Sequence, residues 1–302
     1  MRKQVFGPAV GFLFILPMLV LCLSASWFQP DLATAAPPSA LSTSPKEILK
    51  ISGCSISRTG YLDFLAAAFT ERTGIKVLIK GGGSAAGLLN LAADSVDLAA
   101  SCLPPEAEPV PAGVRMIPVA WDPLVFVVPS SNPLAGISLE QARAIFLGQV
   151  SNWQDLGGPN QPLSLYLQYA PRAKMQGVPY FIQKKFLGGR EITANPAILQ
   201  TRPSGGLVEE ALARDPWGFA ATGFTSARLK SDKLRMLAVN GVTPSRKTII
   251  SGAYPAELQR HLYLALRGSA SPAAERFLTF VLSKEGQNLL RAHGAIALTD
   301  LP

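Results

Sequence analysis

The chain has 302 residues, of which 48% are hydrophobic and 16% charged, and its formal net charge is +8. This composition is that of a globular protein, and three cysteines are too few for a disulfide scaffold or a cysteine-rich metal site. The mild positive charge suits an anionic solute or surface, whereas the lack of basic clusters interleaved with aromatic residues argues against nucleic acid as a partner.

Residues 1–35 have the layout of a secretory signal peptide. A basic pair precedes a long apolar run, and Ala33 and Ala35 form an A-x-A cleavage site that would make Ala36 the new N-terminus. The sequence therefore predicts a periplasmic or secreted protein. An uncleaved membrane anchor stays open because the apolar run is long enough to span a bilayer.

Alternating strand and helix patterns begin after a Pro- and Ser-rich linker at 36–45. The first five predicted elements are a strand at 47–53, a helix at 60–74 closed by Gly74, a strand at 75–81, a helix at 85–95 and a strand at 96–101. This order predicts a parallel sheet. The loops that follow the three strands should therefore meet at one edge of the sheet, where such sheets bind ligands.

The alternation continues to the C-terminus. Two apolar strands are expected within 114–134, and a helix capped by Ser138 with Gln141 three residues on is expected next. Further strand and helix patterns occupy 162–169, 179–187, 206–224 and 234–239. A strand at 261–268 and one long amphipathic helix at 271–294 close the chain.

The loop "KGGGSAAG" at 80–87 poses the question of a bound nucleotide. Gly82 and Gly87 have the spacing of a P-loop, but Leu88 stands where that motif needs lysine. A Gly-rich turn that opens a helix still offers free N–H groups to an anion. An anion cradle and a ligand-free turn both remain open on these residues alone.

Several segments together resemble the phosphate-binding proteins of bacterial ABC importers, PstS-like members of the type 2 periplasmic binding fold. The segments are "TGIKVLIKGGGSAAGLLNLAADSVDLAAS", "ISLEQARAIFLGQVSNWQDLGG", "DPWGFAAT", "SGAYPAELQRHLYLAL" and "FVLSKEGQNLLRAHG". The resemblance implies an α/β fold with two lobes, built of mixed sheets flanked by helices. Lobe I would hold 46–124 and the C-terminal return 249–302, and lobe II would hold 125–248.

The resemblance also implies an oxyanion site between the lobes and a membrane permease as partner, in a monomeric protein without cofactor, metal or catalytic activity. The residues of this chain that match the family's ligand positions are Ser55, Ser57, Ser84, Ala85, Cys102, Arg172, Gln176 and Gly177. The loop hydroxyls and N–H groups would donate to the oxyanion, and the arginine would neutralise it by paired hydrogen bonds.

Three of the matched positions depart from the family. The motif R-x-x-x-S-G-T appears here as Arg172 followed by Gln176, Gly177 and Val178, so two hydroxyl donors are missing. Cys102 stands where the family often places an aspartate that accepts the proton of hydrogen phosphate. A neutral thiol would remove that acceptor, so we expect sulfate, molybdate or tungstate to bind at least as well as phosphate.

Cys54 and Cys102 support a second interpretation. Both end strands that should be neighbours, so the two thiols are expected to lie close enough for a disulfide. A thiol-dependent redox protein is the alternative that this pair leaves open, although no general base stands beside either cysteine. A sensor or adaptor on the same fold, without a transport role, is the other alternative.

Overall fold

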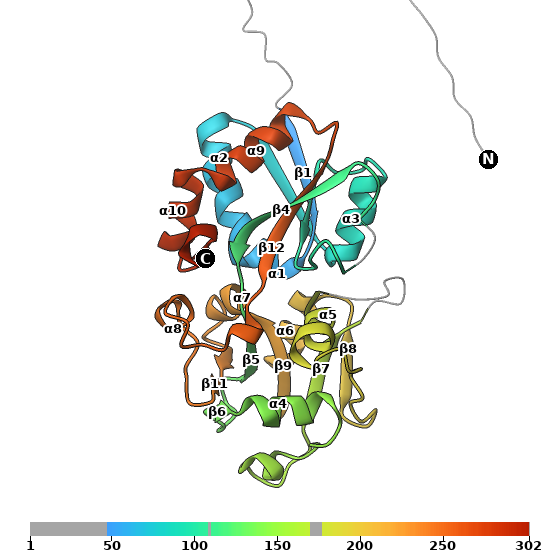
Figure 1. Ribbon diagram of the computed structural model, residues 1–302, viewed down its shortest axis with the longest axis vertical. Helices are drawn as coiled ribbons and strands as arrows, with labels where there is room; N and C mark the ends of the chain where they lie inside the picture. Colours follow the sequence, from blue (N-terminus) through green and yellow to red (C-terminus); the bar gives the residue numbers. More distant parts are fainter. Residues whose placement is uncertain (1–46, 108–109, 170–176, 302) are drawn as a thin grey trace, which may run out of the picture. The chain divides into compact units, whose positions relative to one another are not determined.

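Two main β-sheets form the framework of the molecule (Figure 1). The structure is a computed structural model and describes residues 47–107, 110–169 and 177–301. The first sheet has the strand order β13-β4-β12-β3-β1-β2, the second has the order β10-β5-β9-β7-β8, and β11 pairs with β6. Parallel and antiparallel pairs occur in both main sheets, which confirms the expected α/β class with mixed sheets.

The strands are β1 (Ile48–Gly53), β2 (Lys76–Gly81), β3 (Leu98–Ser101), β4 (Val114–Trp121), β5 (Leu124–Pro129), β6 (Gly136–Ile137), β7 (Ser164–Gln168), β8 (Leu199–Arg202), β9 (Gly218–Gly223), β10 (Leu234–Met236), β11 (Ala238–Val239), β12 (His261–Arg267) and β13 (Ile296–Ala297). The α-helices are α1 (Ser55–Ser57), α2 (Asp63–Thr73), α3 (Ser84–Ala92), α4 (Leu139–Phe146), α5 (Gly177–Phe181), α6 (Gly205–Leu212), α7 (Phe224–Arg228), α8 (Arg246–Ile250), α9 (Pro272–Leu282) and α10 (Lys284–Ala292). Short π-helical segments lie at η1 (Arg58–Leu62) and η3 (Ile182–Phe186), and 3-10 turns lie at η2 (Trp153–Leu156), η4 (Ala256–Leu258) and η5 (Leu298–Asp300).

The first sheet places several strand ends at one edge. β1 pairs in parallel with both β2 and β3, as the sequence predicts, and β12 runs antiparallel to β3 and to β4. The carboxyl ends of β1, β3 and β4 therefore share an edge with the start of β12. Helix α3 covers one face of this sheet, and α2, α9 and α10 cover the other (Figure 1).

Local signals placed most helix ends correctly. Gly74 ends α2 with a left-handed φ of 73°, and Ser138 and Gln141 form the predicted capping box of α4. The prediction of one long helix at 271–294 is wrong. Ser283 adopts an extended ψ of 160°, ends α9 and caps α10 by accepting a 3.1 Å hydrogen bond from the N–H of Gly286. The run at 283–288, which contains no apolar side chain, marks the break in the sequence.

A buried ion pair joins the two chain crossings between the sheets. Asp122 lies between β4 and β5, and Arg260 lies just before β12. The Nη2 of Arg260 donates to Oδ2 of Asp122 at 2.9 Å, its Nε donates to the Asp122 carbonyl at 3.0 Å, and the Asp122 N–H donates to the Arg260 carbonyl at 2.9 Å. The backbone N–H of Thr225 donates to Oδ1 of Asp122 at 2.9 Å. The pair therefore ties both crossings to the start of α7.

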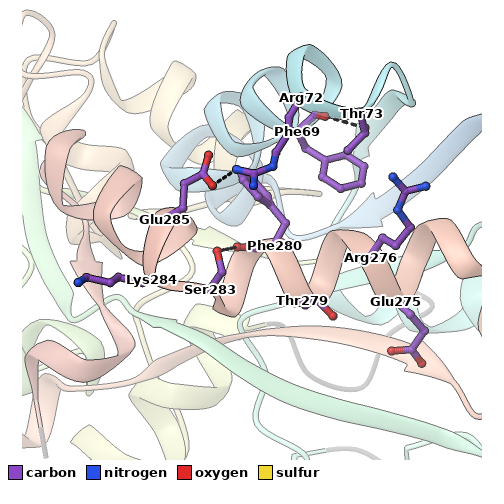
Figure 2. A pocket seen from close by; sticks show the side chains of 10 residues that line it. All are labelled: Phe69, Arg72, Thr73, Glu275, Arg276, Thr279, Phe280, Ser283, Lys284 and Glu285. Carbon is purple, nitrogen blue, oxygen red and sulfur yellow. Dashed lines mark hydrogen bonds and ion pairs between the residues drawn. The ribbon is translucent and has the colours of Figure 1, made fainter.

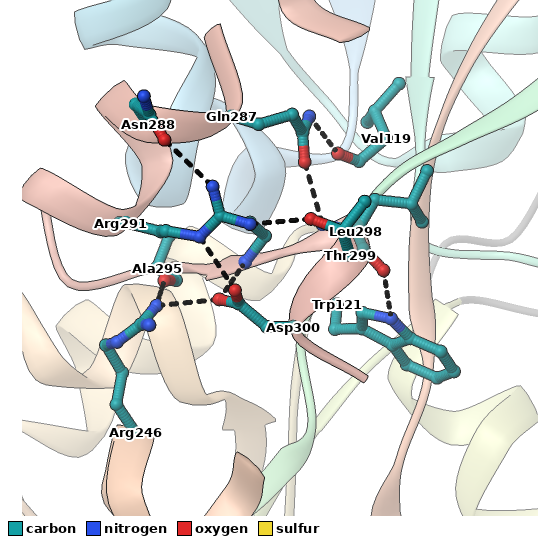
Figure 3. A network of polar contacts seen from close by, with 11 residues as sticks. Val119, Trp121, Arg246, Gln287, Asn288, Arg291, Ala295, Leu298, Thr299 and Asp300 are labelled. Atoms are coloured by element: carbon teal, nitrogen blue, oxygen red, sulfur yellow. Dashed lines mark hydrogen bonds and ion pairs between the residues drawn. The ribbon is translucent and has the colours of Figure 1, made fainter. Parts of the chain in front are cut away.

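A second polar network fastens the C-terminal segment (Figure 3). Asp300 accepts from Nε of Arg291 at 2.7 Å and from Nη1 of Arg246 at 3.0 Å. Gln287 donates to the carbonyl of Val119 at 3.1 Å, which links α10 to β4. Because Arg246 belongs to α8, this network connects the C-terminus to the segment that precedes the second crossing.

We predict that Asp122→Ala destabilises the protein by about 3–5 kcal/mol, because it leaves the guanidinium of Arg260 buried without its partner. Urea unfolding followed by circular dichroism measures this change. The matched control is Arg72→Ala, which breaks the exposed ion pair with Glu285 and should cost about 0–1 kcal/mol. Equal losses of stability in the two variants would contradict the structural role of the buried pair.

Candidate functional site

The three predicted loops meet at the carboxyl edge of the first sheet. The N–H of Cys54 donates to the carbonyl of Ala100 at 2.8 Å, and the N–H of Gly83 donates to the carbonyl of Gly53 at 2.9 Å. The hydroxyl of Ser84 accepts a 3.0 Å hydrogen bond from the N–H of Cys102. The loops that end β1, β2 and β3 are thus joined by direct hydrogen bonds, as the sequence predicts.

The glycine-rich loop brings the start of α3 close to β1. Gly83 has a left-handed φ of 104°, and Gly87 lies so close to the backbone of Ser52 and Gly53 that a side chain there would collide with it. Ser84 and Ala85 open the helix and are both buried. The first N–H groups of a helix have no acceptor within it and carry the positive end of its dipole, so this turn can hold an anion.

Ser55 and Ser57, the hydroxyl residues expected beside the cradle, lie in the short helix α1. Ser55 is half-buried and lies between Gly81 at the end of β2 and Gly206 in the first turn of α6. Ser57 is fully buried, and its hydroxyl has no hydrogen-bond partner among the described residues. Ser55 therefore lies between β2 of the first sheet and helix α6, and Ser57 is buried in the interior.

Gly177, the predicted ligand residue at the start of α5, lies directly against Cys102. A methyl group on Gly177 would collide with the Sγ of Cys102, so only glycine fits at this position. Gly177 comes after β7, a strand of the second sheet, and it lies beside Cys102 at the cradle. Arg172 and Gln176 lie outside the described residues, and their predicted roles stay predictions. Val178 is buried and offers no hydroxyl.

Two thiols occupy the centre of this site. The Sγ atoms of Cys54 and Cys102 are 3.0 Å apart, both residues are buried, and both are free cysteines. The hydroxyl of Ser84 lies 3.4 Å from the Sγ of Cys102. The predicted proximity of the two cysteines is confirmed, and the disulfide itself remains a prediction.

The two thiols differ in acidity. The hydrogen bond donated by the Cys54 thiol, the charge of Arg260 and the hydroxyl of Ser84 outweigh burial and lower the pKa of Cys102 to about 6. The same thiol hydrogen bond and burial raise the pKa of Cys54 well above its ordinary value. Cys102 is therefore the more acidic of the two thiols. The expectation of a neutral thiol did not include the hydrogen bond from Cys54 or the charge of Arg260, both of which favour the thiolate form.

Arg260 is the site residue that the sequence did not reveal. Burial opposes its charge, but Cys102, Asp122 and Cys54 outweigh burial and hold the pKa of Arg260 above its ordinary value. Its place beside Cys102 follows from β12 running between β3 and β4. No local motif marks Arg260. Its place in the site could have been predicted only from the pairing of β12 with β3 and β4.

Other features of the described residues lie apart from this site. An open hollow of about 540 Å³ between α2, α9 and α10 is spanned by the ion pair of Arg72 and Glu285 (Figure 2). It contains none of the predicted site residues.

Within the part of the chain that the structure describes, no cluster of three or more His, Cys, Asp or Glu residues could hold a metal ion. No helix in that same part has the length and apolar character needed to cross a membrane.

We predict that mild oxidation joins Cys54 to Cys102, because a bond of about 2.05 Å requires the two sulfurs to approach by only about 1 Å. Oxidised glutathione supplies the disulfide for exchange, and alkylation of the denatured protein followed by mass spectrometry counts the remaining thiols. The oxidised protein should show no adduct at these residues and the reduced protein two. The Cys54→Ser variant has no second thiol to displace glutathione, so its Cys102 should carry either the alkyl group or a glutathione adduct, and two alkyl adducts after oxidation of the wild type would refute the prediction.

Comparison with known proteins places the chain and its fold in a family. A model described as a PBP superfamily domain matches residues 38–285. The phosphate-binding protein PstS of Bacillus subtilis (strain 168) is 28% identical over 258 residues, an alignment that covers 84% of this chain and 81% of that protein. Protein SphX of Synechococcus elongatus is also 28% identical, over 78% of this chain and 73% of that protein.

A solved structure has the same fold. A substrate-binding protein assigned to a phosphate ABC transporter of Clostridium perfringens, with bound phosphate, superimposes with a TM-score of 0.71 at 18% identity, over 83% of this chain and all of that chain. These relatives agree with the resemblance found in the motifs. Since the family model spans most of the sequence, this chain belongs to the PBP superfamily.

Proposed function

We propose that this protein is an extracytoplasmic solute-binding protein of an ABC-type importer and that it binds phosphate or a related tetrahedral oxyanion between its two lobes. The observation that carries the proposal is the meeting of the Ser84 turn, Cys102 and Gly177 at one sheet edge. The names of the relatives in Bacillus subtilis and other bacteria, which are phosphate-binding proteins, support the same ligand class.

The proposed binding relies on donors that are already positioned. The N-terminal turn of α3 and the hydroxyls of Ser55 and Ser84 would donate to the oxyanion, and Arg172 would neutralise it. Backbone donors held by the β1 and β3 hydrogen bonds need little reorganisation when an anion enters. Gly177, which already lies against Cys102, would keep water from the bound anion on that side, and this strengthens each charge-assisted hydrogen bond.

Cys102 would set the selectivity of this site. A thiolate can accept the proton of hydrogen phosphate, as the family's aspartate does, and it repels an anion that has no proton to donate. When Cys102 is protonated, that repulsion disappears. Phosphate, sulfate, molybdate and tungstate would therefore bind with a preference that depends on the charge of one sulfur.

Export and partnership complete the proposal. The predicted signal peptide at 1–35 would carry the protein out of the cytoplasm, and the closed, liganded monomer would deliver its anion to a membrane permease. In this proposal the protein has no catalytic turnover. A sensor on the same fold would bind the same ligand but would not associate with a permease, so co-purification with a permease separates the two roles.

We expect calorimetric titration of the purified protein to show one oxyanion bound per chain. The Arg172→Ala variant should weaken binding by about 10- to 100-fold, because it removes charge-assisted hydrogen bonds of about 1.5–3 kcal/mol. The matched control is Arg214→Ala, which removes an exposed arginine on the loop after α6. The proposed function is refuted if none of the four anions phosphate, sulfate, molybdate and tungstate binds to the protein.

The pH dependence of sulfate binding tests the role of Cys102. Sulfate stays fully ionised, so its affinity should rise at least about tenfold as the pH falls through about 6, where the Cys102 thiolate becomes neutral and its repulsion is lost. Calorimetry at a series of pH values measures the change in the reduced protein. The Cys102→Ala variant should bind sulfate with nearly constant affinity over the same range. Identical profiles for the variant and the wild type would exclude this role of the thiolate.

A further inference from the structure

The backbone around Cys54 and Cys102 holds their two thiols next to each other. Cys54 directly follows β1, Cys102 directly follows β3, and the two strands pair in parallel with Gly53 opposite Ala100. The N–H of Cys54 donates to the carbonyl of Ala100, and the N–H of Cys102 donates to the hydroxyl of Ser84. The 3.0 Å separation of the sulfurs is therefore set by the sheet and its loops, and a disulfide of about 2.05 Å forms with little movement of either strand.

The sulfur of Cys102 is also part of the wall of the anion cradle. It lies 3.4 Å from the hydroxyl of Ser84, which the proposed function uses as a donor to the anion. On another side it lies so close to Gly177 that no side chain fits there. Because the effect of a charge is strong over such short distances in a buried site, a change of charge on this sulfur acts directly on an anion held by the Ser84 turn.

The buried groups around this sulfur make its charge matter. Arg260 and Asp122 form an ion pair at 2.9 Å, and the arginine favours the thiolate form of Cys102 while the carboxylate opposes it. As a thiolate, Cys102 is a second anionic partner of Arg260, so this cluster is negative. Once the sulfur is joined to Cys54, Arg260 faces Asp122 alone and the cluster is neutral. Tyr61 stays uncharged in both forms, because burial raises its pKa well above its ordinary value.

Exchange with a small disulfide such as oxidised glutathione converts one form to the other. The Cys102 thiolate attacks one glutathione sulfur and expels the other glutathione as a thiolate. Cys54 then loses its proton and displaces the second glutathione. Two electrons pass from the cysteine pair to oxidised glutathione, one S–S bond is broken and one is formed, and two glutathione molecules leave. The charge of Arg260 eases the reverse step, because stabilising the reduced form makes a disulfide easier to reduce.

We propose that Cys54 and Cys102 are a redox-controlled selectivity element of the anion site: the reduced pair favours hydrogen phosphate, and the disulfide favours an oxyanion without a proton, such as sulfate. This inference rests on the proposed function, since it assumes that the cradle holds an oxyanion. A thiolate accepts the proton of hydrogen phosphate and repels sulfate, whereas a disulfide is uncharged. Oxidation therefore removes a hydrogen bond that only hydrogen phosphate makes, and it removes a repulsion for which sulfate has no compensation.

Calorimetric titration of the reduced and the oxidised wild-type protein with phosphate and with sulfate tests the proposal. The measurements are made at about pH 8, above the pKa of about 6 of Cys102 in the reduced protein. Mass spectrometry first checks that the oxidised sample has lost two hydrogens and carries no glutathione. We expect the ratio of sulfate affinity to phosphate affinity to rise at least about tenfold on oxidation, as the loss of a charge-assisted hydrogen bond predicts, and to return on reduction with dithiothreitol.

The Cys102→Ala variant is the control for the sulfur itself. It has no sulfur in the wall of the cradle and cannot form the bridge. Oxidised glutathione should therefore leave its ratio of sulfate to phosphate affinity unchanged, measured on protein that carries no glutathione. That ratio should be close to the ratio for the oxidised wild type. The wild-type comparison needs no substitution, so it keeps the test valid if Cys102→Ala does not fold.

The outcomes separate the two proposals. If phosphate or sulfate binds and the affinity ratio is the same in the reduced and the bridged protein, the selectivity element is overturned and the proposed function stands. Failure of the bridge to form in oxidised glutathione, or equal loss of both anions on oxidation, overturns it in the same way. If neither redox form binds any oxyanion, the proposed function and this inference fail together.

Discussion

The buried ion pair between Asp122 and Arg260 is the interaction on which the rest of the site depends. It lies where the chain crosses between the two main sheets, and three hydrogen bonds within the pair hold both crossings in register. Gly223 has no room for a side chain against the Asp122 carboxylate, so the end of β9 in the second sheet needs glycine at this position. Replacing either partner alone would leave a buried charge uncompensated.

The same pair sets the electrostatics of the anion cradle. Arg260 stabilises negative charge on Cys102, and Cys54 donates a hydrogen bond to the same sulfur. One arginine therefore supports the fold through Asp122 and the chemistry through Cys102. The second crossing of the chain between the two main sheets is therefore coupled to the ligand site, because the side chain of Arg260 takes part in both.

Much of the fold could be predicted from local sequence. The glycine-rich loop, the Ser138 capping box and the alternation of strand and helix all appear in the structure as expected, because each depends on residues close together in the chain. The break at Ser283 was missed although the sequence carries a signal for it, since residues 283–288 contain no apolar side chain and serine is a favoured N-cap residue. Ser84 and Cys102 were assigned to the cradle from the family resemblance, and the expected parallel sheet placed the loops that carry them at one edge.

The remaining parts of the site depend on contacts between distant segments. Arg260 lies 158 positions after Cys102 in the sequence and reaches it only because β12 inserts between β3 and β4. The contribution of Arg260 to the lowered pKa of Cys102, which adds to that of the Cys54 hydrogen bond, follows from that insertion. Sequence reasoning therefore pointed to the loops that meet at this sheet edge, but it did not include the effect of Arg260 on the central sulfur.

A crystal of the protein grown with tungstate provides the most direct test of where an anion binds. Anomalous scattering from tungsten identifies the bound ion without any assumption about its contacts. At tungstate concentrations high enough to overcome the repulsion of the Cys102 thiolate, the account predicts an anomalous peak between the hydroxyl of Ser84 and the backbone of Gly177, next to Cys102. A peak found only elsewhere in the molecule, or no peak at saturating tungstate, would contradict it.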